Sequence, residues 1–259
     1  MTVTVTPTVE PANDPPRIRL NVAASAGETA ATVLRLDPDG RQREVRTFDG
    51  NPLVISGGVA LVYDYEAPLG SAVSYSTVQS PATVSAQVTL REAEDRVWLV
   101  HVGVPELSMP IRVASLGNRT RRVTQSVLRP SGSEFPVVQT DGARKAPEGV
   151  IEVRTDSLAE MARLEALTWD SGVLLLNVPV ALGWGVSTCY IAVGDIEESR
   201  MVEYAAEPGR YFNFPYLVVD RPAGGSQSDR TWADVVADNA TWASVTAKYS
   251  SWLDLLAGP

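Results

Sequence analysis

Short runs of alternating polar and apolar residues, separated by turn sequences, dominate the first ninety residues of this chain. Residues 17–22 and 43–48 both show the period of two that places successive side chains on opposite faces of a strand. Three further strand candidates cover residues 59–65, 72–78 and 83–90. Because no helical periodicity lies among these runs, the pattern predicts a β-sandwich over residues 1–92.

A distinctive corner connects two of these strands. The segment Asp64-Tyr65-Glu66-Ala67-Pro68-Leu69-Gly70 is followed by Tyr75 inside the next strand. An aromatic residue just beyond such a corner commonly fixes it through its hydroxyl group. This pattern resembles a fibronectin type III domain, and the resemblance covers residues 14–91. The early tryptophan of that family is missing, so an immunoglobulin-like variant stays open.

A second unit is expected over residues 93–222, and it is again mainly β. Its strand candidates are residues 97–102, 109–113, 135–140, 150–155, 173–180, 188–193 and 212–219. One helix interrupts them. Ser157 and Glu160 have the spacing of a capping box, and an apolar residue recurs every three positions from Leu158 to Leu167, before Gly172. The unit is therefore predicted to be a β-barrel or sandwich that carries one packed helix.

Three tryptophans recur ten residues apart near the C-terminus, after a linker rich in glycine and serine. In one continuous helix, ten residues at about 100° each would offset successive tryptophans by roughly 80°. The repeat instead predicts three short helices within residues 223–259, capped by Thr231, Thr241 and Ser251. Their predicted docking residues are Trp232, Val235, Val236, Trp242, Val245, Trp252, Leu255 and Leu256.

Helices this short are marginal alone in water, so the repeats need a surface to pack on. One interpretation is that they fold back on the second unit of the same chain. Another is that they anchor to a neighbouring subunit or to another protein through buried tryptophans. A third is that the tail is disordered or that its tryptophans stack on carbohydrate.

Charge and hydropathy limit the classes of partner. The net charge of −9 disfavours nucleic acid, because phosphate binding needs a clustered basic surface. Arg119, Arg121 and Arg122 form a local basic cluster, which is interpreted as a solvated loop. No apolar run approaches the length of about 18 residues that spans a bilayer, and the N-terminus lacks the pattern of a signal peptide.

No sequence motif indicates catalysis, a metal site or a cofactor, so no catalytic, cofactor-binding or metal-ligating residue is predicted. The single Cys189 and the single His101 cannot build a structural zinc site. Cys189 is expected to be a small buried residue on a strand, and His101 a packed or surface imidazole. Two acid pairs could in principle serve a glycosidase, Asp64 with Glu66 and Asp195 with Glu197, but acid pairs at turns are usually solvated. The segment 37–40 looks like the start of a calcium loop, yet a plain β-turn explains it.

Three passages together resemble minor tail proteins of long-tailed phages that infect actinobacteria. They are the corner at residues 64–70, the stretch from Val97-Trp98-Leu99-Val100-His101 to Asp141-Gly142-Ala143-Arg144, and the threonine-tryptophan tandem. The middle unit is similar in layout to distal tail proteins, whose barrel with one helix is related to the tail-tube fold and forms a ring. In this chain the matching region is residues 136–222, although a sandwich precedes it where those proteins begin with the barrel.

The resemblance implies a non-enzymatic virion protein of the tail tip or baseplate, made in the host cytoplasm. It implies a homo-oligomer, such as a hexameric or trimeric ring, that joins the tail tube to host-recognition parts. Other partners would be the tail tube, the tape measure or a hub protein, and a host surface glycan. The alternative is a cell-wall glycan-binding module, with Trp184 as its candidate contact. A carbohydrate-cleaving tail enzyme is a third interpretation.

Overall fold

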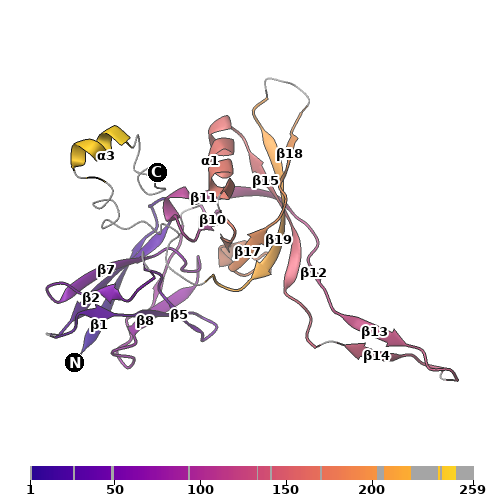
Figure 1. Cartoon of the computed structure of the whole chain (residues 1–259), viewed down its shortest axis with the longest axis horizontal. Helices are drawn as coiled ribbons and strands as arrows, with labels where there is room; N and C mark the ends of the chain where they lie inside the picture. Colours follow the sequence, from indigo (N-terminus) through magenta and orange to yellow (C-terminus); the bar gives the residue numbers. More distant parts are fainter. Residues whose placement is uncertain are drawn as a thin grey trace.

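The protein is described by a computed structural model that covers residues 2–25, 27–47, 50–92, 94–132, 134–140, 142–169, 171–202, 207–222, 239 and 241–248. The chain is mainly β, and it contains a closed six-stranded barrel and one main helix. Figure 1 shows an N-terminal lobe of strands, the barrel beside it, and a long hairpin that leaves the barrel on the far side.

Two antiparallel sheets build the N-terminal lobe. The first contains β1 (Val3–Glu10), β2 (Arg17–Ala24) and β7 (Val59–Asp64). The second contains β5 (Gln42–Glu44), β4 (Val33–Leu36), β8 (Ala72–Thr77) and β9 (Val88–Thr89), in that order. A two-stranded pair joins β3 (Ala30–Ala31) to β6 (Leu53–Val54). Both main sheets contribute buried side chains to one core, for example Ile18 and Leu20 from β2 and Tyr75 from β8.

Two predicted strands of this lobe are shorter than expected. The strand predicted over residues 83–90 is reduced to β9, and the strand predicted over residues 43–48 contributes only its start to β5. In the first case the Ser85 hydroxyl accepts a hydrogen bond from the Tyr75 backbone N–H, at 3.0 Å. A serine side chain that binds the backbone in this way competes with the regular strand ladder, so pairing beside β8 is interrupted.

The corner after β7 is fixed by buried polar groups. The hydroxyl group of Tyr75 donates a hydrogen bond to Asp64 Oδ2 at 3.0 Å, and Tyr75 is fully buried. Arg35 also donates to both oxygens of Asp64 and to Asp37. Burial and the negative charge of Asp64 raise the pKa of Tyr75 far above its ordinary value, which keeps the hydroxyl group protonated as a donor. The corner is thus held through an aromatic hydroxyl, as its sequence suggests.

The barrel closes through six antiparallel strands in the order β15, β11, β10, β16, β17, β19, and β19 pairs back with β15. Their bounds are β10 (Val97–His101), β11 (Met109–Leu116), β15 (Pro147–Thr155), β16 (Leu174–Asn177), β17 (Cys189–Val193) and β19 (Arg210–Val219). Two short strands add to the barrel: β12 (Thr120–Arg121) pairs antiparallel with β15, and β18 (Glu197–Arg200) pairs antiparallel with β19. Two 3-10 turns, η1 (Pro105–Leu107) and η2 (Val180–Leu182), connect neighbouring strands.

The helix α1 (Leu158–Trp169) lies where the sequence predicts one packed helix, between the capping box and Gly172. The Glu160 N–H donates to Ser157 Oγ at 3.2 Å, while the Glu160 carboxylate accepts from the Asp156 N–H at 2.8 Å. These bonds satisfy amide groups that the first turn of a helix leaves unpaired. Leu164 and Leu167 are buried in the barrel core, whereas Leu158, expected on the same stripe, is exposed because it precedes the turns that meet the barrel.

The two lobes share one hydrophobic core. Trp98, Val100, Leu175 and Tyr190, which point outward from the barrel, are buried together with the core residues of the N-terminal lobe. Asn177 on β16 adds polar contacts, because its Nδ2 donates to the Ala67 carbonyl and its Oδ1 accepts from the Leu69 N–H. Strands β10, β16 and β17 therefore present a covered face to the N-terminal lobe.

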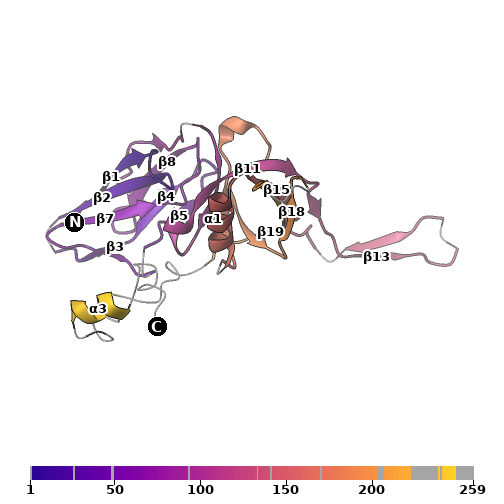
Figure 2. The same cartoon turned by 90° about the horizontal axis from the view of Figure 1, so that it is seen from above.

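A long hairpin leaves the barrel between β12 and β15. Its strands are β13 (Gln125–Leu128) and β14 (Val137–Thr140), which pair antiparallel. Figures 1 and 2 agree that this hairpin extends away from both lobes. We call the segment formed by residues 117–146 the arm. The sequence predicts a strand at residues 135–140, but β12, β13 and β18 are not among the predicted strands.

The C-terminal region is described only at Asn239 and residues 241–248, where α3 (Trp242–Lys248) forms a short helix. The predicted linker beyond Pro222 and the first and third tryptophan repeats lie outside the described residues. Within the described part of the chain, every helix is too short or too polar to cross a membrane.

Candidate functional site

Of the three predicted docking helices, the structure describes the middle one, which carries Trp242 and Val245. The Ser244 N–H donates to Thr241 Oγ1 at 3.2 Å, and the Thr241 N–H donates to Ser244 Oγ at 3.3 Å, so Thr241 and Ser244 cap the start of α3. Trp242 is 61% exposed and Val245 is buried. The remaining predicted docking residues fall outside the described residues, namely Trp232, Val235, Val236, Trp252, Leu255 and Leu256.

The arm is the most exposed β structure among the described residues. Between Ala114 and Ala146, every described residue is exposed except Val123, which is half-buried. The register pairs Val127 with Val138 and Leu128 with Val137. Since neighbouring residues of a strand point to opposite faces, each pair lies on a different face of the hairpin. The arm therefore presents aliphatic side chains on both faces.

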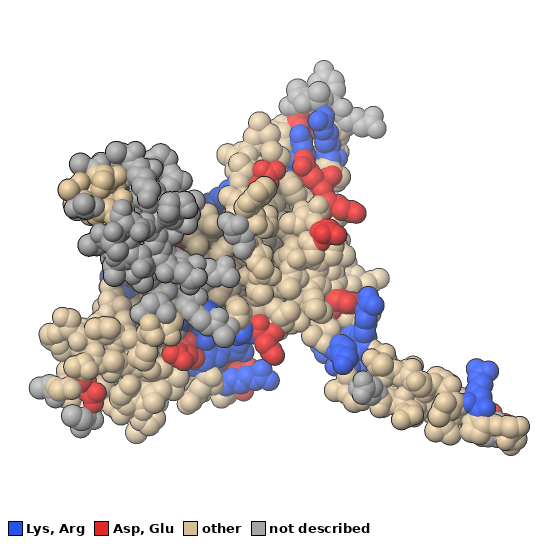
Figure 3. Space-filling model, viewed as in Figure 1, with Lys and Arg blue, Asp and Glu red and all other residues tan. Residues whose placement is uncertain are grey.

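The arm is also basic. Its sequence contains two acidic residues, Glu134 and Asp141, and six basic residues, Arg119, Arg121, Arg122, Arg129, Arg144 and Lys145. The expectation of a solvated loop for the first three is only partly right, because Thr120–Arg121 pairs with β15 as β12 and Arg122 binds Glu148 at 2.5 Å. In Figure 3 blue side chains mark the base and the tip of this projection. Arg121, Arg129 and Arg144 form no ion pair with any described residue.

The outer surface of β15, β19 and β18 is the second exposed feature, and we call it the open face of the barrel. The register places Glu152, Asn213 and Glu197 in one row across these three strands. Val150 and Pro215 form the next row on the same face, and Glu148 and Leu217 form the one after it. Val150 is 39% exposed and Leu217 is 43% exposed. Acidic side chains therefore border an exposed apolar strip, and Figure 3 shows red residues gathered along this side.

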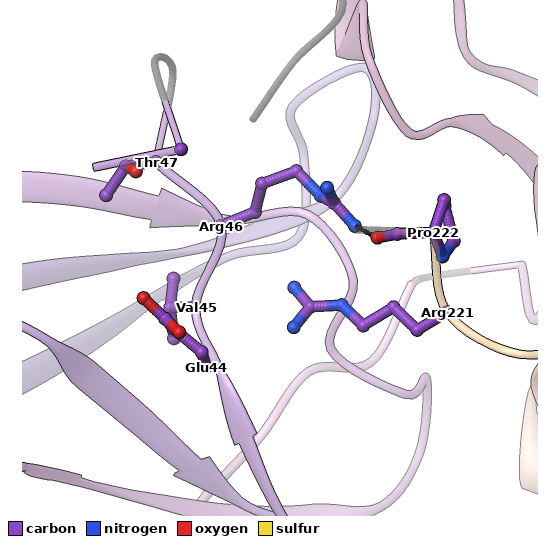
Figure 4. A pocket seen from close by; sticks show the side chains of 7 residues that line it. Glu44, Val45, Arg46, Thr47, Arg221 and Pro222 are labelled. Atoms are coloured by element: carbon purple, nitrogen blue, oxygen red, sulfur yellow. Dashed lines mark hydrogen bonds between the residues drawn. The ribbon is translucent and has the colours of Figure 1, made fainter. Parts of the chain in front are cut away.

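A charged junction joins the lobes. One Glu66 oxygen accepts from Arg46 at 2.7 Å, and the other accepts from Arg221 and from the Tyr190 hydroxyl group at 2.8 Å. Burial and the nearby Glu66 charge raise the pKa of Tyr190, so its hydroxyl group stays a donor. Beside them lies a cavity of about 290 Å³ whose lining includes Glu44, Arg46 and Arg221 (Figure 4). Because Arg221 and Tyr190 of the barrel bind Glu66 of the N-terminal lobe, and Arg46 of that lobe donates to the Pro222 carbonyl, the junction holds the lobes together.

Two of the residues considered for chemistry are packed into the fold. His101 is buried, and its Nδ1 accepts hydrogen bonds from the Gly103 and Val104 N–H groups, at 3.1 and 2.8 Å. Cys189 is half-buried on β17, and burial raises the pKa of its thiol. No group of three or more histidine, cysteine or carboxylate residues within the described ranges could hold a metal ion.

The acidic candidates are divided between structural and exposed positions. Asp64 is bound by Arg35 and Tyr75, as described for the corner, and Glu66 belongs to the lobe junction. Asp195 and Glu197 lie exposed at the β18 end of the barrel. At residues 37–40, the Gly40 N–H donates to the Asp37 carbonyl at 2.9 Å, which is the β-turn that the sequence suggests.

The arm and the open face were not found from the sequence as functional surfaces. One usable signal was local: two aliphatic pairs flank Pro130-Ser131-Gly132, a turn sequence, and Gly132 has a φ of +84°. No local sequence signal indicates the open face, because its rows of neighbouring side chains form only when β15, β19 and β18 pair in the observed register. A scan against protein-family models and a search of curated proteins both found no match for this chain.

Proposed function

We propose that this chain is a non-enzymatic structural protein of a phage tail tip or baseplate. It forms a symmetric oligomer that joins the tail tube to host-recognition parts. The arm carries this proposal, because it projects from a closed barrel with aliphatic residues on both faces. A two-stranded hairpin without further packing is marginal in water, and a neighbouring subunit would supply the missing packing.

The fold agrees with this proposal. The strand order β1-β2-β7 against β5-β4-β8-β9, with Tyr75 bound at the corner, supports a fibronectin III or immunoglobulin-like sandwich as the first domain. The six-stranded barrel with α1 supports a relation of the second domain to tail-tube and distal tail proteins. The shared core would keep the two domains in one fixed orientation, which suits a rigid building block.

The C-terminal repeats would add a second contact to this assembly. The capped α3 with its exposed Trp242 supports three short docking helices that reach a neighbouring subunit or another tail protein. The partners would be the tail tube, the tape measure or a hub protein, and the location would be the virion. Many copies of a weak contact would then give a stable assembly.

Electron microscopy of the purified chain tests this function. Rings of uniform size, and density at the tail tip of particles in which the chain is labelled, are the expected results. A chain that stays monomeric at high concentration and is absent from particles would refute the proposal.

The second candidate is a cell-wall glycan-binding module, and two exposed tryptophans favour it. Trp169 at the end of α1 is 85% exposed, and Trp184 is 38% exposed, so neither belongs to the core. Exposed indole rings can stack on sugars. Binding of isolated cell-wall polysaccharide that is lost in the Trp169→Ala or Trp184→Ala variant would support this candidate, while absence of binding would remove it.

A further inference from the structure

We infer that the arm of one copy of this chain docks on the open face of the barrel in a second copy. The inference rests on the self-assembly in the proposed function and names the two surfaces that form the contact. Because these surfaces differ, each copy would use its arm toward one neighbour and its open face toward the other. Such head-to-tail contacts generate rings or filaments.

The aliphatic side chains of the arm are not covered by described residues of their own chain. Val127 with Val138 lie on one face of the hairpin and Leu128 with Val137 on the other, and all four are at least half exposed. The two views in Figures 1 and 2 show no described part of the chain packed against β13 and β14. Folding alone therefore leaves both faces uncovered.

The outer side of β15, β19 and β18 is left uncovered by the N-terminal lobe. The N-terminal lobe covers the outward residues of β10, β16 and β17, including Val100, Leu175 and Tyr190. The outward residues of β15, β19 and β18 lie on the other side, where Val150 and Leu217 remain exposed. An incoming hairpin would find its apolar surface there.

The arm and the open face present apolar and charged side chains in the same order along their strands. On the arm, the row Val127–Val138 is followed two residues later by Arg129. On the open face, the row Val150–Pro215 is followed two residues later by Glu152, with Glu197 in the same row across β19. Two residues along a strand span about 6.8 Å, which separates Val150 from Glu152, and Arg129 directly follows the last residue of β13. Aliphatic rows can therefore meet while Arg129 reaches a carboxylate.

The basic residues of the arm and the acidic residues of the open face can form ion pairs with each other across the contact. Arg121, Arg129 and Arg144 on the arm form no ion pair with described residues, and neither do Glu152 and Glu197. The arm carries four more basic than acidic residues, while the whole chain has a net charge of −9. A basic arm would be attracted to the acidic remainder of another copy, and added salt would weaken that attraction.

Paired charge reversals test the contact. The arm variant carries Arg129→Glu and Arg144→Glu, and the face variant carries Glu152→Lys and Glu197→Lys. Each variant alone brings like charges together, so the concentration for half-assembly should rise by roughly a hundredfold or more. An equal mixture restores attraction, because the acidic arm of one variant meets the basic face of the other. Mass photometry and sedimentation velocity measure the size of the assemblies.

Controls separate this inference from the proposed function. Arg41→Glu reverses a charge on an exposed side chain of the N-terminal lobe and should leave assembly unchanged. Near-ultraviolet circular dichroism verifies that every variant is folded. If wild-type protein assembles and the arm or face variant assembles equally well, or the mixture fails to recover, the docking inference is wrong and the proposed function survives. If the wild-type protein stays monomeric, the docking inference is wrong, and if it is also absent from particles, the proposed function is wrong as well.

Discussion

Replacing Glu66 with glutamine should destabilise the whole molecule, because this one carboxylate neutralises two arginines at the junction of the lobes. Its side chain is 6% exposed, and its partners Arg46 and Arg221 are 10% and 23% exposed. Glutamine keeps the shape but removes the charge, so the partly buried guanidinium groups of Arg46 and Arg221 lose their ion pairs with Glu66. Breaking a buried ion pair in this way costs about 3 kcal/mol.

Thermal unfolding of the full chain measures this effect. For a chain of this size, about 3 kcal/mol corresponds to a fall in Tm of about 6 to 12 °C. Asp39→Asn is the matched control, because it removes the long ion pairs of an exposed carboxylate with Arg41 and Arg43, and exposed pairs of this kind contribute about 1 kcal/mol or less each. If Glu66→Gln lowers the Tm no more than Asp39→Asn does, the junction does not hold the lobes together as described.

Three further outcomes are expected. Leu167→Ala removes a fully buried side chain of α1 from the barrel core and should lower the free energy of unfolding by about 3 kcal/mol in urea titrations; a loss below 1 kcal/mol would contradict the packing. Burial disfavours the Glu92 carboxylate, but hydrogen bonds from Arg96 outweigh it and lower the pKa of Glu92 below its ordinary value of 4.5. The stability advantage of the wild-type protein over Glu92→Gln should therefore be complete well above pH 4.5 and disappear as the pH falls through the lower folded pKa, and an advantage that grows in acid would refute this. Since burial raises the pKa of Cys189, a thiol reagent at pH 8 should label the folded chain at least about tenfold more slowly than the unfolded chain, and equal rates would count against that burial.

The helix and most of the strands were predictable because their signals are local. Ser157 and Glu160 mark the start of α1, and the three-residue spacing of leucine and methionine marks its buried face. The corner that Tyr75 holds was also recognisable, since its residues lie close together in the sequence. Short apolar runs indicate the approximate positions of β10 and β17, and alternating residues indicate that of β11.

The barrel closure and the candidate interface could not be predicted from such local signals. Closure depends on the pairing of β15 with β19, two strands about sixty residues apart in the sequence. Neither strand contains a local sequence signal that identifies the other as its partner. The row of Glu152 and Glu197 exists only once that register is set. The strand β13 was missed because Gln-Ser-Val-Leu does not alternate, which is also why the arm is apolar on both faces. The first and third tryptophan repeats remain predictions.

A cryo-EM structure of the purified full chain would test the central claim most directly. We predict a closed ring in which the arm of each copy lies on β15, β19 and β18 of the next, with Arg129 facing the Glu152 and Glu197 row. Particles that contain one copy with a free arm, or rings in which the open face is bare, would contradict it.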